Sequence, residues 1–217
     1  MKILALEFSS SQRSVAVADG GRACAEVIET GGRNTNAIGM IDAALREAKL
    51  EREQIKCLAI GLGPGSYTGI RAAISVAQGW QLARADSGMK LLGISSAECL
   101  AAQAQADGLK GRVYVIIDAQ RGEFYIACHE IGPDRRKEVE PVRLTSPDSI
   151  RQLEKSGAVL VGPEVTRWFP SGRPLFPRAA TVAALSTDRS DFVSGEKLEP
   201  IYLREASFVK APPPKIF

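Results

Sequence analysis

Histidine is scarce in this sequence, and paired cysteines are missing. The one histidine is His129, and the four cysteines lie far apart without a Cys-x-x-Cys pair. A multi-histidine zinc site therefore cannot be built, and a Ser-His-Asp triad would depend on His129, whose surroundings favour a half-exposed strand residue instead. Widely spaced cysteines are typical of a reducing compartment, so we expect a cytoplasmic protein.

Long apolar runs and a strong charge of one sign are absent as well. No stretch approaches the roughly 18 consecutive apolar residues of a membrane helix, and the run after Met1 meets Glu7 too early for the core of a signal peptide. We therefore expect no membrane association. The net charge is +3 and is spread over both halves of the chain, which disfavours tight, direct RNA binding. With 217 residues, 45% of them hydrophobic, the chain is typical of one large globular domain or two small ones.

Strand and helix patterns alternate in the first half of the chain. Alternating or β-branched segments predict an antiparallel start with a Gly20-Gly21 hairpin turn, and apolar residues at helical spacing follow. Asn34 or Thr35 is expected to cap the first helix. The expected elements are strands at 2–8, 14–19, 22–29, 57–61 and 91–94 and helices at 35–49, 69–85 and 95–106.

The same order of elements begins again at Arg112. The expected elements are strands at 112–118, 123–129, 137–144 and 158–161, a helix from Pro147 that Gly157 ends, and a helix from Ala179 to about Phe192. This repetition predicts an α/β protein made of a duplicated unit, with a mixed sheet in each half. We expect a first lobe over residues 1–106 and a second lobe over residues 107–217, which ends in a Pro-rich tail.

A glycine loop between a strand and a helix is the first candidate for chemistry. It runs from Gly61 to Gly69, and its backbone amides and the following helix N-terminus suit an anion. The glycine spacing matches neither the dinucleotide fingerprint nor a P-loop. Two interpretations of the loop remain at this point. Gly65 and Ser66 contact a phosphate, or the glycines only allow tight packing of the loop.

A matched pair of acids is the second candidate. Glu7 precedes a serine turn that contains Ser9, and Asp118 precedes a turn that contains Gln120. In a duplicated unit these strand ends face each other across a cleft, where acids can hold hydrated magnesium and turns can contact phosphates. The alternative is that each acid only anchors its own turn. A free-standing actin-like ATPase or phosphotransferase that uses Glu7 and Asp118 is therefore one hypothesis.

Four segments, in the same order and spread over almost the whole chain, resemble the TsaB (YeaZ) family. They are Ile3–Leu6, Gly63–Arg71, Ile117–Tyr125 and Pro200–Arg204. The resemblance implies a duplicated actin-like (ASKHA, ribonuclease H-like) fold. It also implies a non-catalytic scaffold that takes part in forming threonylcarbamoyladenosine next to the anticodon of tRNA, where a TsaD-type paralogue carries out catalysis and a TsaE-type ATPase assists.

Two departures from the family pattern weaken an autonomous nucleotide site. Glu7 stands where the family usually has Asp, and Arg33-Asn34 stands where it usually has a His-Ser pair. We therefore expect no catalytic residues, no metal and no tightly bound cofactor in the chain alone, and we consider ATP and magnesium as possible ligands in the complex. A peptidase activity is excluded, because one histidine without paired cysteines cannot form the clustered ligands of a metallopeptidase. The tRNA is expected to be contacted only through the complex.

The first two helices of the chain are the expected partner surface. Their apolar stripes are widened by small or pliable side chains, which permit close helix packing. These residues are Met40, Ala44 and Ala48 on the first helix and Ala72, Val76 and Gly79 on the second. The resemblance implies that the same surface serves a homodimer when the protein is alone and the TsaD-type paralogue in the complex. The alternative is that these residues simply belong to the core.

Overall fold

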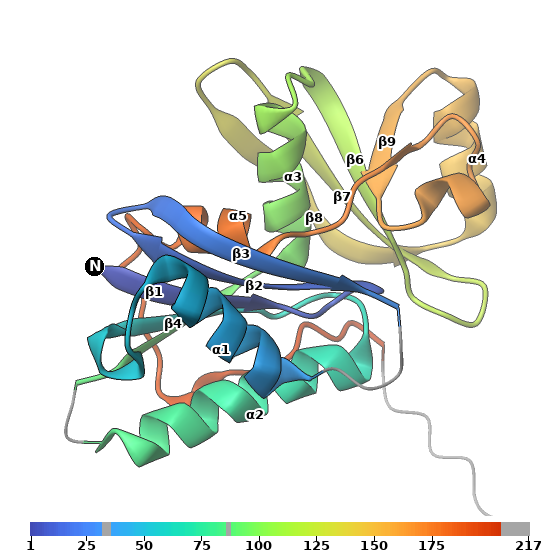
Figure 1. The fold of residues 1–217 in the computed structure, drawn as a ribbon. Helices are drawn as coiled ribbons and strands as arrows, with labels where there is room; N and C mark the ends of the chain where they lie inside the picture. Colours follow the sequence, from blue (N-terminus) through green and yellow to red (C-terminus); the bar gives the residue numbers. More distant parts are fainter. Residues whose placement is uncertain (32–35, 86–87, 205–217) are drawn as a thin grey trace, which may run out of the picture.

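Two lobes, each built on a five-stranded sheet, make up the protein (Figure 1). The computed structural model describes residues 1–31, 36–85 and 88–204. The strand order is β3-β2-β1-β4-β5 in the first sheet and, read in the same sense, β8-β7-β6-β9-β10 in the second. In both sheets the first strand is antiparallel to the second and parallel to the fourth. This shared order confirms the predicted α/β class, a duplicated unit with two mixed sheets.

Most elements begin and end within two residues of the predicted bounds. The strands are β1 (Lys2–Glu7), β2 (Gln12–Asp19), β3 (Arg22–Thr30), β4 (Cys57–Gly61), β5 (Lys90–Ile94), β6 (Gly111–Asp118), β7 (Phe124–Ile131), β8 (Arg136–Thr145), β9 (Val159–Gly162) and β10 (Arg173–Pro174). The α-helices are α1 (Ala37–Ala48), α2 (Tyr67–Ala83), α3 (Ser96–Ala106), α4 (Pro147–Lys155) and α5 (Ala179–Leu185). Within the described residues, no helix has the length and apolar character needed to cross a membrane.

Three details differ from the sequence prediction. The side chain of Asn36 caps α1 by accepting from the Gly39 amide at 3.0 Å, whereas the predicted caps lie at 34 and 35, outside the described residues. The helix α5 ends at Leu185 rather than near Phe192, and the Ser186 hydroxyl bonds the Val182 carbonyl at its end. The two-residue strand β10 was not predicted. The Arg33-Asn34 pair and the Pro-rich tail also fall outside the described residues.

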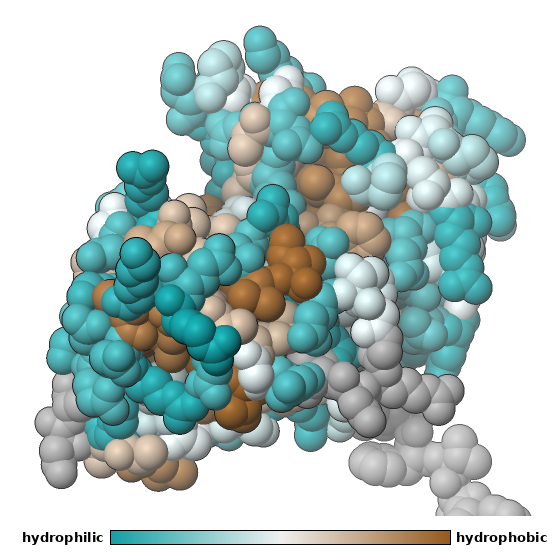
Figure 2. Space-filling model, viewed as in Figure 1, coloured by the Kyte–Doolittle hydropathy of each residue, from teal (hydrophilic) through white to brown (hydrophobic). Residues whose placement is uncertain are grey.

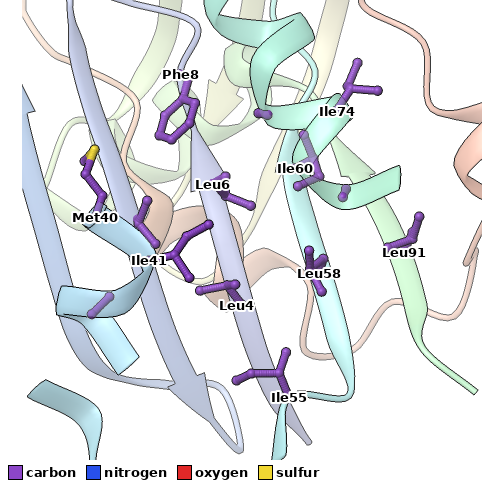
Figure 3. Close-up of a cluster of buried hydrophobic side chains, with 14 of the residues drawn as sticks. Leu4, Leu6, Phe8, Met40, Ile41, Ile55, Leu58, Ile60, Ile74 and Leu91 are labelled. Atoms are coloured by element: carbon purple, nitrogen blue, oxygen red, sulfur yellow. The ribbon is translucent and has the colours of Figure 1, made fainter. Parts of the chain in front are cut away.

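The outer core of the first lobe lies between its sheet and the helices α1 and α2. Side chains alternate along β1, so Leu4 and Leu6 face these helices while Ile3 and Ala5 face the other side. Figure 3 shows Ile41 of α1 close to Leu4 and Leu6, in a cluster whose members are almost fully buried. Each such side chain contributes roughly 1.5–3 kcal/mol by leaving water, so this face fixes α1 and α2 on the sheet.

Met40 and Ala44 belong to this core, which makes their assignment to a partner surface wrong. Met40 is 1% exposed and Ala44 is fully buried, and Figure 3 shows Met40 beside the sheet. Both residues lie on the same face of α1 as Ile41 and Leu45, because positions three to four residues apart share one side of a helix. The interpretation of these two residues as core is therefore the correct one.

The helices α3 and α5 lie between the two sheets. The apolar side of α3, with Leu100 and Ala104, packs on the second sheet, while Cys99 packs with α5 and the inner face of the first sheet. Burial raises the pKa of the Cys99 thiol well above its ordinary value, with the charge of Glu7 adding to the effect. On the far side of the second sheet, Ile150 of α4 packs against β6, β7 and β9 side chains. Helices and sheets thus alternate across the molecule (Figure 1).

Residues 179–204 return from the second sheet to the first. The Ala179 and Ala180 amides donate to the Ser14 hydroxyl at 2.7 Å and to the Glu26 carboxylate at 3.0 Å, which holds the start of α5 on β2 and β3. Further on, Val193 pairs with Leu91 of β5. The last strand of the first sheet ends at residue 94 and the first strand of the second sheet begins at residue 111, on either side of the predicted boundary at 106 and 107. Residues 179–204, however, pack against the first lobe although they follow the second sheet in sequence. The lobe boundary itself stays a prediction.

His129 is buried rather than half-exposed. Its side chain lies on the α3 side of β7, where it is 2% exposed and its Nδ1 atom has no hydrogen-bond partner among the described residues. Burial, with a smaller effect from the charge of Arg136, lowers its pKa from 6.5 to about 4. The imidazole is therefore neutral at physiological pH.

Candidate functional site

A cleft of about 1140 Å³ separates the two lobes. One wall comes from the β1–β2 turn and the glycine loop of the first lobe, and the other comes from the β6–β7 turn and the residues after β9. The lining residues include Ser9, Ser10, Ser11, Arg13, Gly65, Ser66, Tyr67, Thr68, Arg71, Asp118, Gln120, Arg121, Tyr125, Glu164, Tyr202 and Arg204. Five of the six predicted phosphate contacts, all except Glu7, thus lie around one cavity.

The glycine loop packs tightly on the β1–β2 turn. The Ser66 amide donates to the Ser9 carbonyl at 2.6 Å. A Cβ atom at Gly65 would lie 2.1 Å from that same carbonyl oxygen, and one at Gly69 would lie 2.0 Å from the Phe8 carbonyl oxygen. These glycines are therefore required by close backbone packing, as the packing interpretation of the loop predicts.

The loop also leads directly into the N-terminus of α2 at the cleft. The Ser66 hydroxyl accepts from the Gly69 amide at 3.3 Å and so caps the helix. The amides of Tyr67 and Thr68 precede the first hydrogen bond within the helix, and both residues line the cleft. The positive end of the helix dipole thus faces this cavity.

Glu7 lies behind the cleft wall and braces it. Its carboxylate accepts from the Ser9 amide at 2.7 Å and from the Ser96 hydroxyl at 2.8 Å, and the same hydroxyl accepts from the Gly63 amide at 3.1 Å. The residue is fully buried, and a Cβ atom on Gly61 would collide with its carboxylate. Burial is the largest effect on its pKa and raises it above 4.5, against the lowering effect of the bonds from Ser9 and Ser96. The structure therefore favours the anchoring interpretation for Glu7.

Asp118 anchors the facing turn in a similar way, but at the cleft surface. Its carboxylate accepts from the Gln120 backbone amide at 2.7 Å and from the Gln120 side chain at 3.0 Å. Gln120 and Arg121 both adopt the left-handed conformation, with φ of 64° and 56°. Two consecutive non-glycine residues in this region cost backbone energy, which the Asp118 bonds offset.

Four cleft arginines were missed by reasoning from the sequence. Arg13, Arg71, Arg121 and Arg204 all line the cavity. Three of them, Arg71, Arg121 and Arg204, stand in segments that carry the family resemblance, which was the available signal. Nothing in the sequence pointed to Arg13, because it lies on β2 and becomes a cleft residue only through the position of the second lobe opposite this strand.

Tyr202 and Arg204 tie the two cleft walls together, and we call this pair the C-terminal clasp. The Tyr202 ring stacks on Tyr67 with centroids 5.2 Å apart, and the Arg71 guanidinium lies 4.3 Å from the centroid of Tyr67. Arg204 donates to the Gln120 carbonyl at 3.1 Å and pairs with Glu123. One residue of the clasp therefore holds the first lobe, and the other holds the β6–β7 turn of the second.

A further tie between the lobes joins Ser11 and Glu164. The Ser11 hydroxyl donates to the Glu164 carboxylate at 2.6 Å. Glu164 adopts a left-handed conformation with φ of 55° and lies in the same cleft wall as Asp118. The cleft is thus bridged by side chains from both of its walls.

The outer surface of α2 carries the remaining predicted residues. Ala72 and Val76 are half-buried, with Val76 partly packed against the core of the first lobe, Gly79 is exposed, and Ala83 continues the same helical spacing. A Cβ atom at Gly79 would meet nothing within 4 Å, so the fold of the chain itself does not require glycine there. We call Ala72, Val76, Gly79 and Ala83 the α2 stripe. Ala48 of α1 is half-buried against the core.

Comparison with known proteins places this geometry in a family. A family model described as "TsaD: tRNA N6-adenosine threonylcarbamoyltransferase" matches residues 33–207. The chain belongs to this family. Its curated relatives include the tRNA threonylcarbamoyladenosine biosynthesis protein TsaB of Escherichia coli K12, which is 29% identical over 94% of this chain and 95% of its own length. The TsaB of Haemophilus influenzae is 27% identical over 98% of both chains.

Solved structures agree with these matches. YeaZ from Pseudomonas aeruginosa has a TM-score of 0.78 and 26% identity, over 93% of this chain and 99% of that chain. A second Pseudomonas aeruginosa structure, described as similar to peptidase YeaZ, has a TM-score of 0.78 and 27% identity, over 94% of this chain and 99% of that one. The TsaB (YeaZ) resemblance of the four sequence segments is therefore confirmed, and with it the actin-like fold.

Proposed function

We propose that this chain is a non-catalytic subunit of the assembly that forms threonylcarbamoyladenosine in tRNA, and that it acts by binding a TsaD-type paralogue. The observation that carries the proposal is the match to TsaB proteins over nearly the full length of both chains. The family model described as TsaD also matches this chain, so the proposed partner shares its fold. Two proteins of the same fold have equivalent helix surfaces, so they can pair through these surfaces in a pseudo-symmetric dimer.

The α2 stripe is the proposed contact surface. A glycine within a helix costs about 1 kcal/mol relative to alanine, and Gly79 has no close contact in this chain that would explain it. Small side chains let a second helix approach closely. An exposed apolar side chain of the same helix lies next to the stripe in sequence, since Leu82 precedes Ala83 and is 79% exposed. Figure 2 shows apolar side chains among polar ones over β3 and the layer of α1 and α2.

The same surface is proposed to pair two copies of the chain when the paralogue is absent. A TsaE-type ATPase and the tRNA are proposed to join through the complex. This chain has a net charge of only +3 and its basic side chains are not concentrated in one lobe. ATP and magnesium are proposed to act in the complex.

The free-standing ATPase remains the competing hypothesis, and the positions of the two acids count against it. The Glu7 carboxylate is buried and engaged by Ser9 and Ser96. The Asp118 carboxylate holds the turn of Gln120. Both acids thus serve the backbone around the cleft, as in the anchoring interpretation.

Reconstitution tests the proposal. Purified chain, TsaD-type and TsaE-type proteins of the same organism, tRNA, threonine, bicarbonate and ATP are combined, and the modified nucleoside is measured by mass spectrometry. We expect product only when all proteins are present, and no ATP hydrolysis by this chain alone. Product from this chain alone, or ATP turnover by it alone, would overturn the scaffold role.

Two matched variants locate the contact. Val76→Arg places a charge on the α2 stripe, and an unpaired buried ion costs several kcal/mol of association, so pull-down of the paralogue and product formation should both be lost. Gln152→Arg on exposed α4 of the other lobe is the control and should leave both unchanged. If a folded Val76→Arg variant still binds the paralogue, the contact surface lies elsewhere.

A further inference from the structure

We propose that Gln103 of α3 holds the two lobes at a fixed angle to each other. The proposal concerns this chain alone and does not depend on the proposed function. The chain passes between the two sheets twice, once from β5 into α3 and once from β10 into α5. A rotation of one lobe against the other has to change the backbone torsions of these two crossings. Side chains hold both of them.

The first crossing is bonded to the first lobe where it enters α3. The Ser96 amide donates to the Gly63 carbonyl at 2.7 Å, and the Ser96 hydroxyl donates to the Glu7 carboxylate at 2.8 Å. Ser96 is fully buried and is the first residue of α3, whose apolar side then packs on the second sheet. The helix α3 is therefore bonded to one lobe at its first turn and packed on the other along its length.

The second crossing has a stiff backbone of its own. Its residues 174–177 read Pro-Leu-Phe-Pro, and Pro177 is buried. Each proline fixes its own φ at about −65°, and Phe176 is confined to extended conformations because a proline follows it. A hinge needs residues that absorb changes in φ and ψ. Little of this freedom is left in the second crossing.

Gln103 bonds the backbone on both sides of Pro177. Its side-chain nitrogen donates to the Phe176 carbonyl at 2.8 Å, and its side-chain oxygen accepts from the Arg178 amide at 2.9 Å. The Cys99 thiol donates to the same oxygen at 3.3 Å. Gln103 is only 9% exposed, so water competes little for these bonds. One side chain of α3 thus bonds both backbone groups that flank the proline, as a neighbouring strand would.

Two ion pairs assist at the same crossing. Arg173 lies 2.8 Å from the carboxylate of Asp107, which directly follows α3. The Arg178 side chain pairs with Glu26 of β3 in the first lobe. The arginines of both pairs are partly exposed, so each pair restrains the crossing less than the buried Gln103 bonds do.

The contacts across the cleft are weaker restraints for the same reason. The C-terminal clasp and the bond between Ser11 and Glu164 join the lobes at the cleft, where their polar atoms are exposed to solvent. Water replaces exposed bonds at little cost, whereas a buried amide that loses its partners pays the full penalty of desolvation. Gln103 therefore contributes most to the fixed angle between the lobes.

Gln105 provides a matched comparison on the same helix. Its side-chain nitrogen donates to the Gly132 carbonyl at 2.9 Å, and its side-chain oxygen accepts from Arg136 at 3.0 Å. These partners belong to the β7–β8 hairpin of the sheet on which α3 packs. Loss of Gln105 therefore removes bonds within one lobe, whereas loss of Gln103 removes the bonds between α3 and the crossing.

Distances between spin labels on the two lobes test the proposal. Cys24 of β3 is exposed while the other three cysteines are buried, so a nitroxide reagent labels the first lobe selectively. Gln152→Cys places the second label on an exposed position of α4 in the other lobe. Double electron–electron resonance on this labelled chain should give one narrow distance distribution. Gln103→Leu keeps a side chain of similar size without its bonds, and it should broaden the distribution and shift part of it to longer distances.

Two control variants should keep the narrow distribution. Gln105→Leu removes equivalent bonds within one lobe, and Tyr202→Ala breaks only the clasp. The thermal midpoint shows that each variant is folded. Gln103→Asn gives the same readout if Gln103→Leu does not fold, because its shorter side chain keeps the amide but cannot span both backbone groups.

Three results would overturn the proposal. The first is a broad distribution in the labelled chain that carries no further substitution, since the lobes would then rotate despite Gln103. The second is a narrow distribution in a folded Gln103 variant. The third is equal broadening in either control, since the angle would then depend on packing within one lobe or on the clasp.

Discussion

Tyr202 stacks on Tyr67 with ring centroids 5.2 Å apart and an interplanar angle of 24°, so the end of the described chain is fixed to the first turn of α2. Arg204, two residues further along the chain, donates to the Gln120 carbonyl across the cleft. Because both residues belong to one short segment, the stacking of Tyr202 determines where Arg204 lies. The glycine loop and the β6–β7 turn are therefore coupled through this clasp.

Loss of the ring at position 202 should loosen the clasp. Tyr202→Ala removes the stack on Tyr67, and we expect a loss of about 1–2 kcal/mol in the free energy of unfolding. Hydrogen exchange should also become faster in the β6–β7 turn, because Arg204 loses its anchor. Tyr202→Phe is the matched control, since it keeps the ring and gives up the hydroxyl, with its long bond of 3.4 Å to the Tyr67 carbonyl and its contact with Arg71. Equal exchange rates in the two variants would contradict this coupling.

Two glycines of α2 should respond in opposite directions to the same substitution. Gly69→Ala brings a Cβ atom to 2.0 Å from the Phe8 carbonyl oxygen, which neither backbone can easily yield, so we expect about 3 kcal/mol of destabilisation. Gly79→Ala meets nothing within 4 Å and should stabilise the protein by up to about 1 kcal/mol. Urea unfolding of the two variants measures both effects. A similar loss of stability in both would mean that Gly79 has a packing role within the chain.

Glu7 should make the protein less stable as the pH rises. Burial raises its pKa above the ordinary 4.5, so above that pH the folded chain holds more protons than the unfolded chain does. The stability that this residue contributes is then fully present below pH 4.5 and is lost as the pH rises through the folded pKa. Glu7→Gln should remove this slope from urea midpoints measured between pH 4.5 and 8. A variant with the slope of the unchanged chain would show that Glu7 is ionised at no cost.

His129 should act in the opposite sense. Its pKa falls from 6.5 to about 4 on folding, chiefly through burial, so its contribution is present above pH 6.5 and is lost as the pH falls towards 4. A depression of this size corresponds to roughly 3 kcal/mol between those limits. His129→Leu keeps an apolar group of similar size and should flatten the acid limb of the stability curve. The prediction fails if the acid limb of the variant matches that of the unchanged chain.

The duplicated fold was predictable because its signals are local. The apolar run of β1 and the helical spacing of α1 both appear within one element, and each recurs at a matching place in the second half. The position of α5 against the first sheet could not be predicted from a local signal. Its position depends on Ser14 and Glu26, which lie more than 150 residues away, and no short pattern carries such a contact.

In the candidate site, too, features with a local sequence signal were predictable and features that depend on distant residues were not. The segments that line the cleft could be named from glycine spacing and strand-end acids, and they do meet around one cavity. The role of Glu7 could not be read from its place at a strand end, because Ser96, which lies 89 residues further on, helps to bury it. Met40 was misassigned for a related reason. The sequence shows that a helix has an apolar stripe, but which residues at its edge are buried depends on the sheet that packs against it.

The return of residues 179–204 to the first sheet has a consequence for synthesis. Every strand of the second sheet has been translated once Pro174 is made, whereas α5 and the Val193 pairing that cover and extend the first lobe come later. A nascent chain can thus complete the later-encoded sheet while the inner side of the earlier one still exposes Ile3 and Ala5. We therefore expect a chain that stops after Arg178 to leave the inner face of the first sheet uncovered and prone to aggregation.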